Sequence, residues 1–190
     1  MENITVGYAM CGSFCTLRQS VDALRELARF NIKIVPIMSQ IVYTTDTRFG
    51  KADDFIKQVE EICGAPIIHD IPGAEPIGPK KLLDLLIICP CTGNTASKIA
   101  LGITDSAVTM ATKAHLRNSR PVVLALASND GLGATGKNIG LLHNTKNIFF
   151  VPYGQDNAVA KPTSLVSDFS KIPPTAEAAL RGEQYQPLLL

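Results

Sequence analysis

The chain has 190 residues, of which 46% are apolar and 18% charged, and its formal net charge is +1. This length fits one domain with a sizeable core, and the near-neutral charge gives no basic excess that would indicate nucleic-acid binding. No apolar run approaches the roughly 20 residues of a membrane span and the N-terminus lacks a leader pattern, so we expect a cytoplasmic protein.

The first half of the chain alternates apolar strands with amphipathic helices. Residues 4–10 predict a strand, and a helix follows the turn CGSFCT because apolar residues recur at helical spacing from Leu17. Thr16 and Gln19 fit a capping box for this helix. A second strand is predicted at 32–39. The next elements are a helix at 51–63 with Gly64 as its C-cap, a short strand at 65–69 and a loop at 70–80.

The second half continues the alternation. Strands are predicted at 82–90, 120–128 and 147–154, and helices at 94–101 and 106–116. Residues 129–142 are rich in glycine at first and then helical in pattern. From residue 155 the many prolines predict irregular structure with one short helix near 175–181. We expect this tail, 155–190, either to pack on a neighbouring protomer or to be disordered.

Strands that alternate with helices at this spacing predict a three-layer α/β/α fold. We expect a mostly parallel six-stranded sheet and one domain over 1–190. In such sheets ligands bind outside the carboxyl ends of the strands, and five polar clusters follow strands in this sequence. All five should therefore lie along one edge of the sheet. The clusters are CGS, SQ, CPCTGNT, ASND and VPYGQDN.

Two of these clusters contain residues suited to binding an anionic ligand. Gly12 and Ser13 precede a helix, where a glycine lets a ligand approach the backbone and free N–H groups favour an anion. Thr92, Asn94 and Thr95 open another helix. Helix capping explains one such residue in each cluster, but it does not explain all three residues of the second. The pattern matches neither a dinucleotide fingerprint nor a phosphate-binding loop of the Walker type.

The five cysteines are an odd number in a chain of this size, so we expect reduced thiols rather than a disulfide framework. Cys11, Cys15, Cys89 and Cys91 follow strands that can be neighbours, and four thiols could meet there around zinc. Their spacing is not typical of a zinc site or a redox pair, and ordinary buried cysteine is common. We therefore predict no metal.

The histidines and the charged loops offer fewer candidates. His69, His115 and His143 stand alone, and only His69 ends a predicted strand near the binding edge. Lys80, Lys81 and Arg48 would meet an anionic substrate if their loops folded over that edge. A solvated surface is the simpler interpretation of all three.

The stretch CPCTGNTASKIALGITDS resembles the homo-oligomeric flavin-containing cysteine decarboxylases, and the resemblance covers about residues 4–152. It implies a Rossmann-like flavoprotein fold that binds FMN. By position, Gly12 and Ser13 would meet the phosphate and Ser39 the ribityl or phosphate end, while residues after the later strands would line the flavin. The matching positions are Pro90, Asn94, Thr95, Lys98, Ala100, Gly102 and Asp105. The implied cofactor-binding residues are Gly12, Ser13, Ser39, Pro90, Thr92, Asn94, Thr95, Thr109, Ser128 and Asn129.

The sequence departs from that family at its catalytic positions. The catalytic histidine of the decarboxylases corresponds to Pro76, and a methionine of their P-x-M-N segment corresponds to Ser128. Decarboxylation is therefore not expected. His69 is the one candidate base that the sequence offers.

A closer resemblance, nearly end to end, is to the B subunits of dipicolinate synthases, a family of flavoprotein-like subunits in spore-forming bacteria. It rests on GYAMCGSFCT, CPCTGNT, ASNDGLGATGKNIG and FVPYGQDNAVAKPTSLVSD. It implies a nicotinamide-dependent partner, the A subunit of dipicolinate synthase, and the oxidation of dihydrodipicolinate to dipicolinate in the mother cell.

The resemblances leave two questions open. The bound cofactor would be FMN or NADP, because both offer a phosphate and a flat ring. The chain would be an oxidoreductase subunit, or a non-catalytic partner that retains a phosphate pocket and activates the A subunit. A homo-oligomer is expected in either case.

Overall fold

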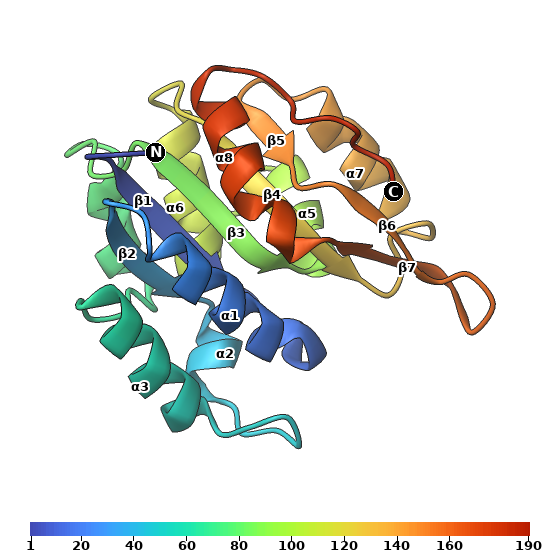
Figure 1. Ribbon diagram of the computed structural model, residues 1–190, viewed down its shortest axis with the longest axis horizontal. Helices are drawn as coiled ribbons and strands as arrows, with labels where there is room; N and C mark the ends of the chain where they lie inside the picture. The colour runs from blue at the N-terminus through green and yellow to red at the C-terminus, as the bar shows by residue number, and fades with distance from the viewer.

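The computed structural model describes residues 1–190, and its centre is a β-sheet covered by helices on both faces (Figure 1). None of the helices has the length and apolar character needed to cross a bilayer. The strands are β1 (Thr5–Met10), β2 (Lys33–Met38), β3 (Leu85–Cys91), β4 (Val122–Ser128), β5 (Ile148–Phe150), β6 (Tyr153–Asn157) and β7 (Lys161–Ser167). The helices are α1 (Leu17–Leu27), α2 (Gln40–Thr44), α3 (Ala52–Cys63), α4 (Ile71–Ala74), α5 (Gly93–Ala100), α6 (Ala107–Leu116), α7 (Gly136–His143) and α8 (Ile172–Leu180).

Five strands form a parallel sheet in the order β2-β1-β3-β4-β5. The chain runs outward from β1 to β2 and then returns to place β3 on the other side of β1. This reversal makes the carboxyl ends of β1 and β3 the switch point, where doubly wound sheets bind their ligands. The strand order therefore supports the predicted binding edge, and the three-layer α/β/α prediction is confirmed.

The two remaining strands form an antiparallel hairpin on the same sheet. β5 pairs with β4 only over residues 122–124, so the second half of β4 has an open edge. β7 fills that edge, pairing Ala127 with Val166 and Ser128 with Leu165. β6 then pairs with β7, and the hairpin projects beyond the body of the molecule (Figure 1).

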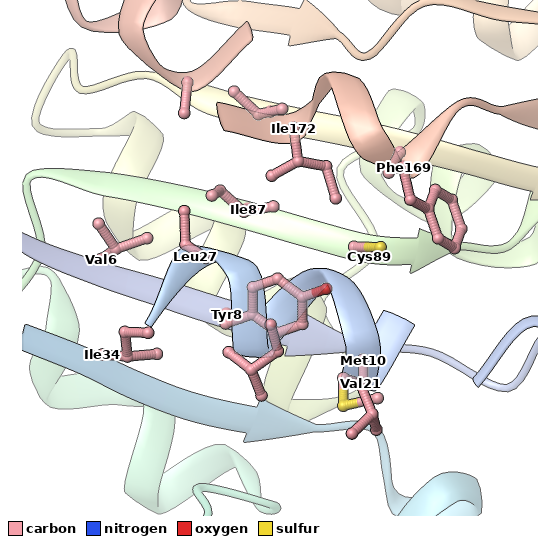
Figure 2. Packing of buried hydrophobic residues seen from close by; sticks show 14 of the residues in the cluster. Val6, Tyr8, Met10, Val21, Leu27, Ile34, Ile87, Cys89, Phe169 and Ile172 are labelled. Carbon is pink, nitrogen blue, oxygen red and sulfur yellow. The ribbon is translucent and has the colours of Figure 1, made fainter. Parts of the chain in front are cut away.

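The core consists of two apolar clusters, one on each face of the sheet. Successive residues of a strand point to opposite faces. Val6, Tyr8 and Met10 of β1 therefore join the cluster under α1, α3 and α8, while Ala9 joins the cluster under α5, α6 and α7. Figure 2 shows the first cluster, where Val21 and Leu27 of α1 and Ile172 of α8 meet the sheet.

A buried hydrogen-bond chain ties α1 to the sheet. The Tyr8 hydroxyl donates to the Ser20 carbonyl at 2.8 Å, and the Ser20 hydroxyl donates to the Cys89 carbonyl at 2.6 Å. All three residues are fully buried. The bonds connect β1, α1 and β3 and so set the position of α1 over the binding edge.

Most predicted elements are confirmed, but several predictions are wrong. Residues 65–69 form one bridge, Ile37 to Ile68, and not a strand. The strand predicted at 147–154 is two strands, β5 and β6, separated at Pro152, which lacks the N–H that a ladder needs. The sheet therefore has seven strands instead of six. The tail is not irregular, because it contains the rest of β6, then β7 and α8.

The predicted capping box at Thr16 and Gln19 does not form. The Thr16 hydroxyl instead donates to the Ser13 hydroxyl at 2.9 Å and to its carbonyl at 3.0 Å. A capping box does form on α6, between Ser106 and Thr109. Short helices also occur where a polar segment and a loop were predicted, at α2 and α4.

Candidate functional site

A cleft of about 610 Å³ lies at the carboxyl ends of β1, β3 and β4. A larger groove of about 910 Å³ lies between α1 and α8. We place the site in the smaller cleft because it lies at the switch point of the sheet, where the helix N-termini converge. Its walls come from the turn after β1, the loop after α2, the start of α5, the end of β4 and the β6–β7 hairpin. The residues that line it are Gly12, Ser13, Phe14, Cys15, Thr16, Arg48, Phe49, Thr92, Gly93, Asn94, Ala127, Ser128, Asn129, Asp130, Asp156, Lys161, Ser164, Leu165 and Val166.

The structure brings six of the ten predicted cofactor-binding residues into this cleft. These six come from three separate segments of the chain: Gly12, Ser13, Thr92, Asn94, Ser128 and Asn129. The other four, Ser39, Pro90, Thr95 and Thr109, do not line it.

The turn after β1 closes one end of the cleft. The Cys11 N–H donates to the Pro90 carbonyl at 3.2 Å and so joins the ends of β1 and β3. A Cβ on Gly12 would lie 3.0 Å from Cγ2 of Ile41, so the backbone here runs close to α2. A 3₁₀ turn at Phe14–Thr16 leads from here into α1. The Ser13 and Thr16 N–H groups donate to the carbonyls of Cys11 and Ser13, whereas those of Phe14 and Cys15 have no backbone acceptor and favour a negative charge.

The start of α5 forms the floor of the cleft. Thr92 caps this helix: its hydroxyl accepts from the Thr95 N–H at 3.1 Å and donates to the Thr95 hydroxyl at 3.0 Å. These two threonines therefore satisfy each other. Asn94 is exposed in the cleft and its amide makes no hydrogen bond within the chain. Asn94 is thus the member of the trio that remains available to a ligand.

A carboxylate that the sequence analysis missed links the end of β4 to the start of α7. Asp130 accepts hydrogen bonds from the Ser128 hydroxyl at 2.9 Å and the Thr135 hydroxyl at 2.6 Å. The hydroxyls of Thr135 and Ser128 hold the pKa of this carboxyl below its usual value. A low pKa makes Asp130 a poor proton acceptor and a good structural anchor. The quoted segment ASNDGLGATG contains both Asp130 and Thr135, but its local pattern does not show that they touch.

Gly93 allows this network to approach α5. A Cβ at Gly93 would lie 2.5 Å from the Ser128 hydroxyl oxygen, 2.8 Å from that of Thr135 and 3.0 Å from Oδ1 of Asp130. Real Cβ contacts are not that short, so a glycine is required here.

Ser39 has the one buried side-chain polar atom in the chain without a hydrogen-bond partner. It stands at the N-cap of α2, and its N–H donates to the Met10 carbonyl at 3.0 Å. Its hydroxyl therefore lies beside the end of β1, one strand away from the cleft-lining turn. An unpaired buried hydroxyl is costly, which makes Ser39 a candidate for contact with a ligand.

The other predicted residues lie away from the cleft. Pro90 is buried in β3 and presents its carbonyl to Cys11. The Thr109 hydroxyl is engaged in the capping box of α6. His69 lies next to β2 and stacks on Tyr43, with 3.9 Å between ring centroids, and it does not line the cleft.

The remaining histidines serve the core and the hairpin. The His115 ring donates to the Pro121 carbonyl at 3.0 Å, and burial lowers its pKa to about 4. Nε2 of His143 lies 2.8 Å from the Tyr153 hydroxyl, and burial also lowers the pKa of His143.

The cysteines do not assemble into a metal site. No group of three or more His, Cys, Asp or Glu side chains is arranged to hold a metal ion, and all five thiols are free. Burial raises the pKa of Cys11 to about 11 and that of Cys89 to about 12, so both are neutral thiols. Cys15 is the exposed one and lines the cleft.

Of the three basic residues weighed for an anionic substrate, only Arg48 lines the cleft. Lys80 and Lys81 precede β3, so they lie at the opposite edge of the sheet, where the strands begin.

The chain is similar to known proteins along most of its length. The profile of the Flavoprotein family matches residues 1–171. The B subunit of dipicolinate synthase from Bacillus subtilis (strain 168) is 43% identical over 185 residues, which are 97% of this chain and 92% of that protein.

Two solved structures give the same result at the level of the fold. The B subunit of dipicolinate synthase from Bacillus halodurans C superposes with a TM-score of 0.92 at 45% identity, covering 100% of this chain and 97% of that one. The FMN-dependent cysteine decarboxylase SpaF superposes with a TM-score of 0.66 at 19% identity, covering 94% of this chain and 98% of that one. The second likeness is one of fold.

Proposed function

The chain belongs to the Flavoprotein family, and from this premise we propose that it is the B subunit of a dipicolinate synthase whose cleft binds FMN. In this proposal it acts with a nicotinamide-dependent partner, the A subunit, to oxidise dihydrodipicolinate to dipicolinate in the mother cell. The observation that carries the proposal is the cleft itself. It lies at the β1/β3 switch point and collects Gly12, Ser13, Thr92 and Asn94. The 43% identity to the B. subtilis protein supports the choice of reaction.

The residues of the cleft fit a phosphorylated flat cofactor. The turn after β1 and the start of α5 both offer backbone N–H groups that have no acceptor within their helices, as an anion requires. The close approach at Gly93 leaves no room for a side chain, and a Cβ at Gly12 would press on the side chain of Ile41. Asn94 has an amide that lacks a partner within the chain, and Ser39, which does not line the cleft, has a buried hydroxyl without a partner. Each of these features is suited to a ligand with a phosphate and a polar ring edge.

Turning a dihydropyridine into an aromatic ring removes a hydride and a proton, and a bound flavin supplies the site that takes the hydride. In our proposal the chain's own residues bind and orient. Gly12 and Ser13 hold the phosphate, and the Asn94 amide hydrogen-bonds the ring. The Ser128–Asp130–Thr135 network holds the end of β4 and the start of α7 in fixed relation, packed against Gly93 of α5.

The proton acceptor is a separate question. No histidine lines the cleft, and the carboxylate of Asp130 is held ionised by two hydroxyls. We retain His69 as the candidate base on its position beside the end of β2. Unchanged turnover in His69→Ala would remove it.

The proposal is tested by titrating the purified chain with FMN, and separately with NADP, by calorimetry. We expect FMN to bind in a 1:1 ratio to each chain. We expect Asn94→Ala to weaken binding at least tenfold, because the ring loses its hydrogen bond with the Asn94 amide. Lys98→Ala is the matched control, since Lys98 is on the same helix but pairs with Asp105 outside the cleft. Binding of NADP in place of FMN would contradict the cofactor assignment.

A second candidate function is that of a non-catalytic partner that activates the A subunit. The absence of a histidine from the cleft lining favours it. It requires Ser13→Ala and Asn94→Ala to leave the activity of the two-protein complex intact. Loss of that activity in either variant would exclude it.

We further propose that residues 155–190 take part in assembly, both with the A subunit and in a homo-oligomer. Four of the chain's ten exposed large apolar residues lie in this segment, including Val159 at the hairpin tip, which is 94% exposed. The others are Leu180, Leu189 and Leu190. Val159→Glu should lower the sedimentation coefficient of an oligomer or weaken capture of the A subunit. If it does neither, the hairpin tip has no part in assembly.

A further inference from the structure

Arg48 is the one charged residue of the cleft that has no partner. Four charged side chains line the cleft, and three of them are engaged. Asp130 accepts from two hydroxyls, and Lys161 pairs with Asp156 at 2.5 Å. Arg48 is exposed and takes part in none of the seven ion pairs of the molecule. Its positive charge is therefore available to a ligand.

The turn that carries Arg48 is fixed in place. Thr47 and Gly50 exchange backbone hydrogen bonds of 3.0 and 3.1 Å around it. Gly50 has φ +153°, and a Cβ there would lie 2.7 Å from the Phe55 ring, so this turn requires glycine. The Arg18 guanidinium donates to the Phe49 carbonyl at 3.3 Å, and Asp46 accepts from the Ala52 N–H at 2.9 Å. The turn is thus tied to both α1 and α3.

The Arg48 guanidinium itself is also oriented. Its central carbon lies 4.8 Å from the centroid of the Phe49 ring, at cation–π distance. Stacking on a ring occupies one face of the guanidinium and leaves its N–H edge free. That edge has the planar fork that matches a carboxylate with two parallel hydrogen bonds.

Resting on the proposed function, we propose that Arg48 binds a carboxylate of the substrate at the mouth of the cleft. The backbone N–H groups after β1 and at the start of α5 provide a separate place for the cofactor phosphate. Arg48 and Lys161 are the two basic side chains of the cleft. Lys161 already pairs with the carboxylate of Asp156, so Arg48 is the one free to pair with a carboxylate of the substrate. Phosphate and carboxylate are both oxyanions, and the test must separate them.

The experiment measures two affinities in the full chain: that for FMN, and that of the FMN-loaded protein for pyridine-2,6-dicarboxylate. Arg48→Gln should weaken dicarboxylate binding at least tenfold, which corresponds to about 1.4 kcal/mol, and change FMN affinity less than twofold. Arg48→Lys keeps the charge without the fork and should give an intermediate loss. Arg29→Gln is the matched control, because Arg29 is an exposed arginine just after α1 that pairs with Glu26 of this helix, outside the cleft.

The remaining outcomes distinguish the role of Arg48 from the identity of the cofactor. Equal dicarboxylate affinity in folded Arg48→Gln would overturn the inference, and so would a loss of FMN affinity alone, which would assign Arg48 to the phosphate. A chain that binds FMN but no dicarboxylate would overturn the inference and leave the cofactor assignment standing. A chain that binds no FMN would contradict the proposed cofactor. In that case, a tenfold loss of dicarboxylate binding by the cofactor-free Arg48→Gln would still support the role of Arg48. If Arg48→Gln fails to fold, the dicarboxylate and FMN affinities of Arg48→Lys are compared with those of the wild-type chain. An unchanged dicarboxylate affinity in Arg48→Lys would then overturn the inference.

Discussion

At the scale of single residues, the candidate site depends on a glycine as well as on polar side chains. Gly93 stands where three oxygen atoms of Ser128, Thr135 and Asp130 converge within 3.0 Å of an added Cβ. This convergence brings the end of β4 against the first turn of α5. The hydroxyls and the carboxylate satisfy one another. The next residue, Asn94, is exposed in the cleft, and its amide makes no hydrogen bond within the chain.

Gly93→Ala should therefore damage both the fold and the site. We expect a loss of about 1–3 kcal/mol in unfolding free energy, typical of overpacking, together with weaker FMN binding. Urea denaturation and calorimetric titration measure the two effects. Gly140→Ala is the matched control: nothing lies within 4 Å of its added Cβ, and alanine is the better helix former. The control should gain about 0.4–1 kcal/mol. Equal stability of the two variants would contradict our account of Gly93.

At the scale of elements, α1 is positioned by hydrogen bonds as well as by apolar packing. Ser20 lies near the N-terminal end of the helix and donates to the Cys89 carbonyl of β3, while its own carbonyl accepts from the Tyr8 hydroxyl of β1. Ser13 is joined to α1 by a 3₁₀ turn at Phe14–Thr16. A shift of the helix would therefore move the turn at the end of the cleft.

Ser20→Ala removes the donor to the buried Cys89 carbonyl. We expect the unfolding free energy to fall by about 1–3 kcal/mol, the cost of leaving a buried acceptor unsatisfied. Thr145→Ala deletes a hydroxyl that also donates to a carbonyl, that of Leu141 at 2.9 Å, but in an exposed position. That control should change stability by less than about 0.5 kcal/mol. Similar losses in both variants, measured by urea denaturation, would show that Ser20 does not act through burial.

At the scale of the whole molecule, the stability is expected to depend on pH through one buried histidine. His115 is 1% exposed and lies at the amino-end edge of the sheet, opposite the cleft. Burial lowers its pKa from 6.5 to about 4 in the folded state. Between these two pH values His115 is protonated in the unfolded chain and neutral in the folded chain. Protonation therefore favours the unfolded state, and stability is lost as the pH falls through this window.

We expect the wild-type chain to lose about 2 kcal/mol more unfolding free energy than His115→Gln between pH 7 and pH 5. The variant keeps a donor for the Pro121 carbonyl but has no group that titrates in this range. Urea denaturation of both chains at the two pH values measures the difference. Equal losses would mean that His115 is not protonated on unfolding in this window.

The sequence by itself determined the parallel part of the fold and the location of the site. Continuous apolar runs predicted β1, β2, β3 and β4, because strands buried on both faces have few polar residues. Helical spacing predicted α1, α3, α5 and α6. Since carboxyl ends of parallel strands share one edge, the polar residues after each strand had to lie together. Gly12, Ser13, Thr92 and Asn94 followed from this reasoning.

Only the tertiary structure decided what closes the cleft. β7 has a proline and exposed polar residues, and its local pattern resembles a loop. It becomes a strand because the short β5 leaves the second half of β4 with unpaired backbone groups, which must find partners when buried. The contact of Asp130 with Thr135 and the entry of Arg48 into the cleft also depend on how separate segments pack. Local sequence patterns report the period and polarity of one segment, whereas these contacts are determined by which segments the whole chain brings together.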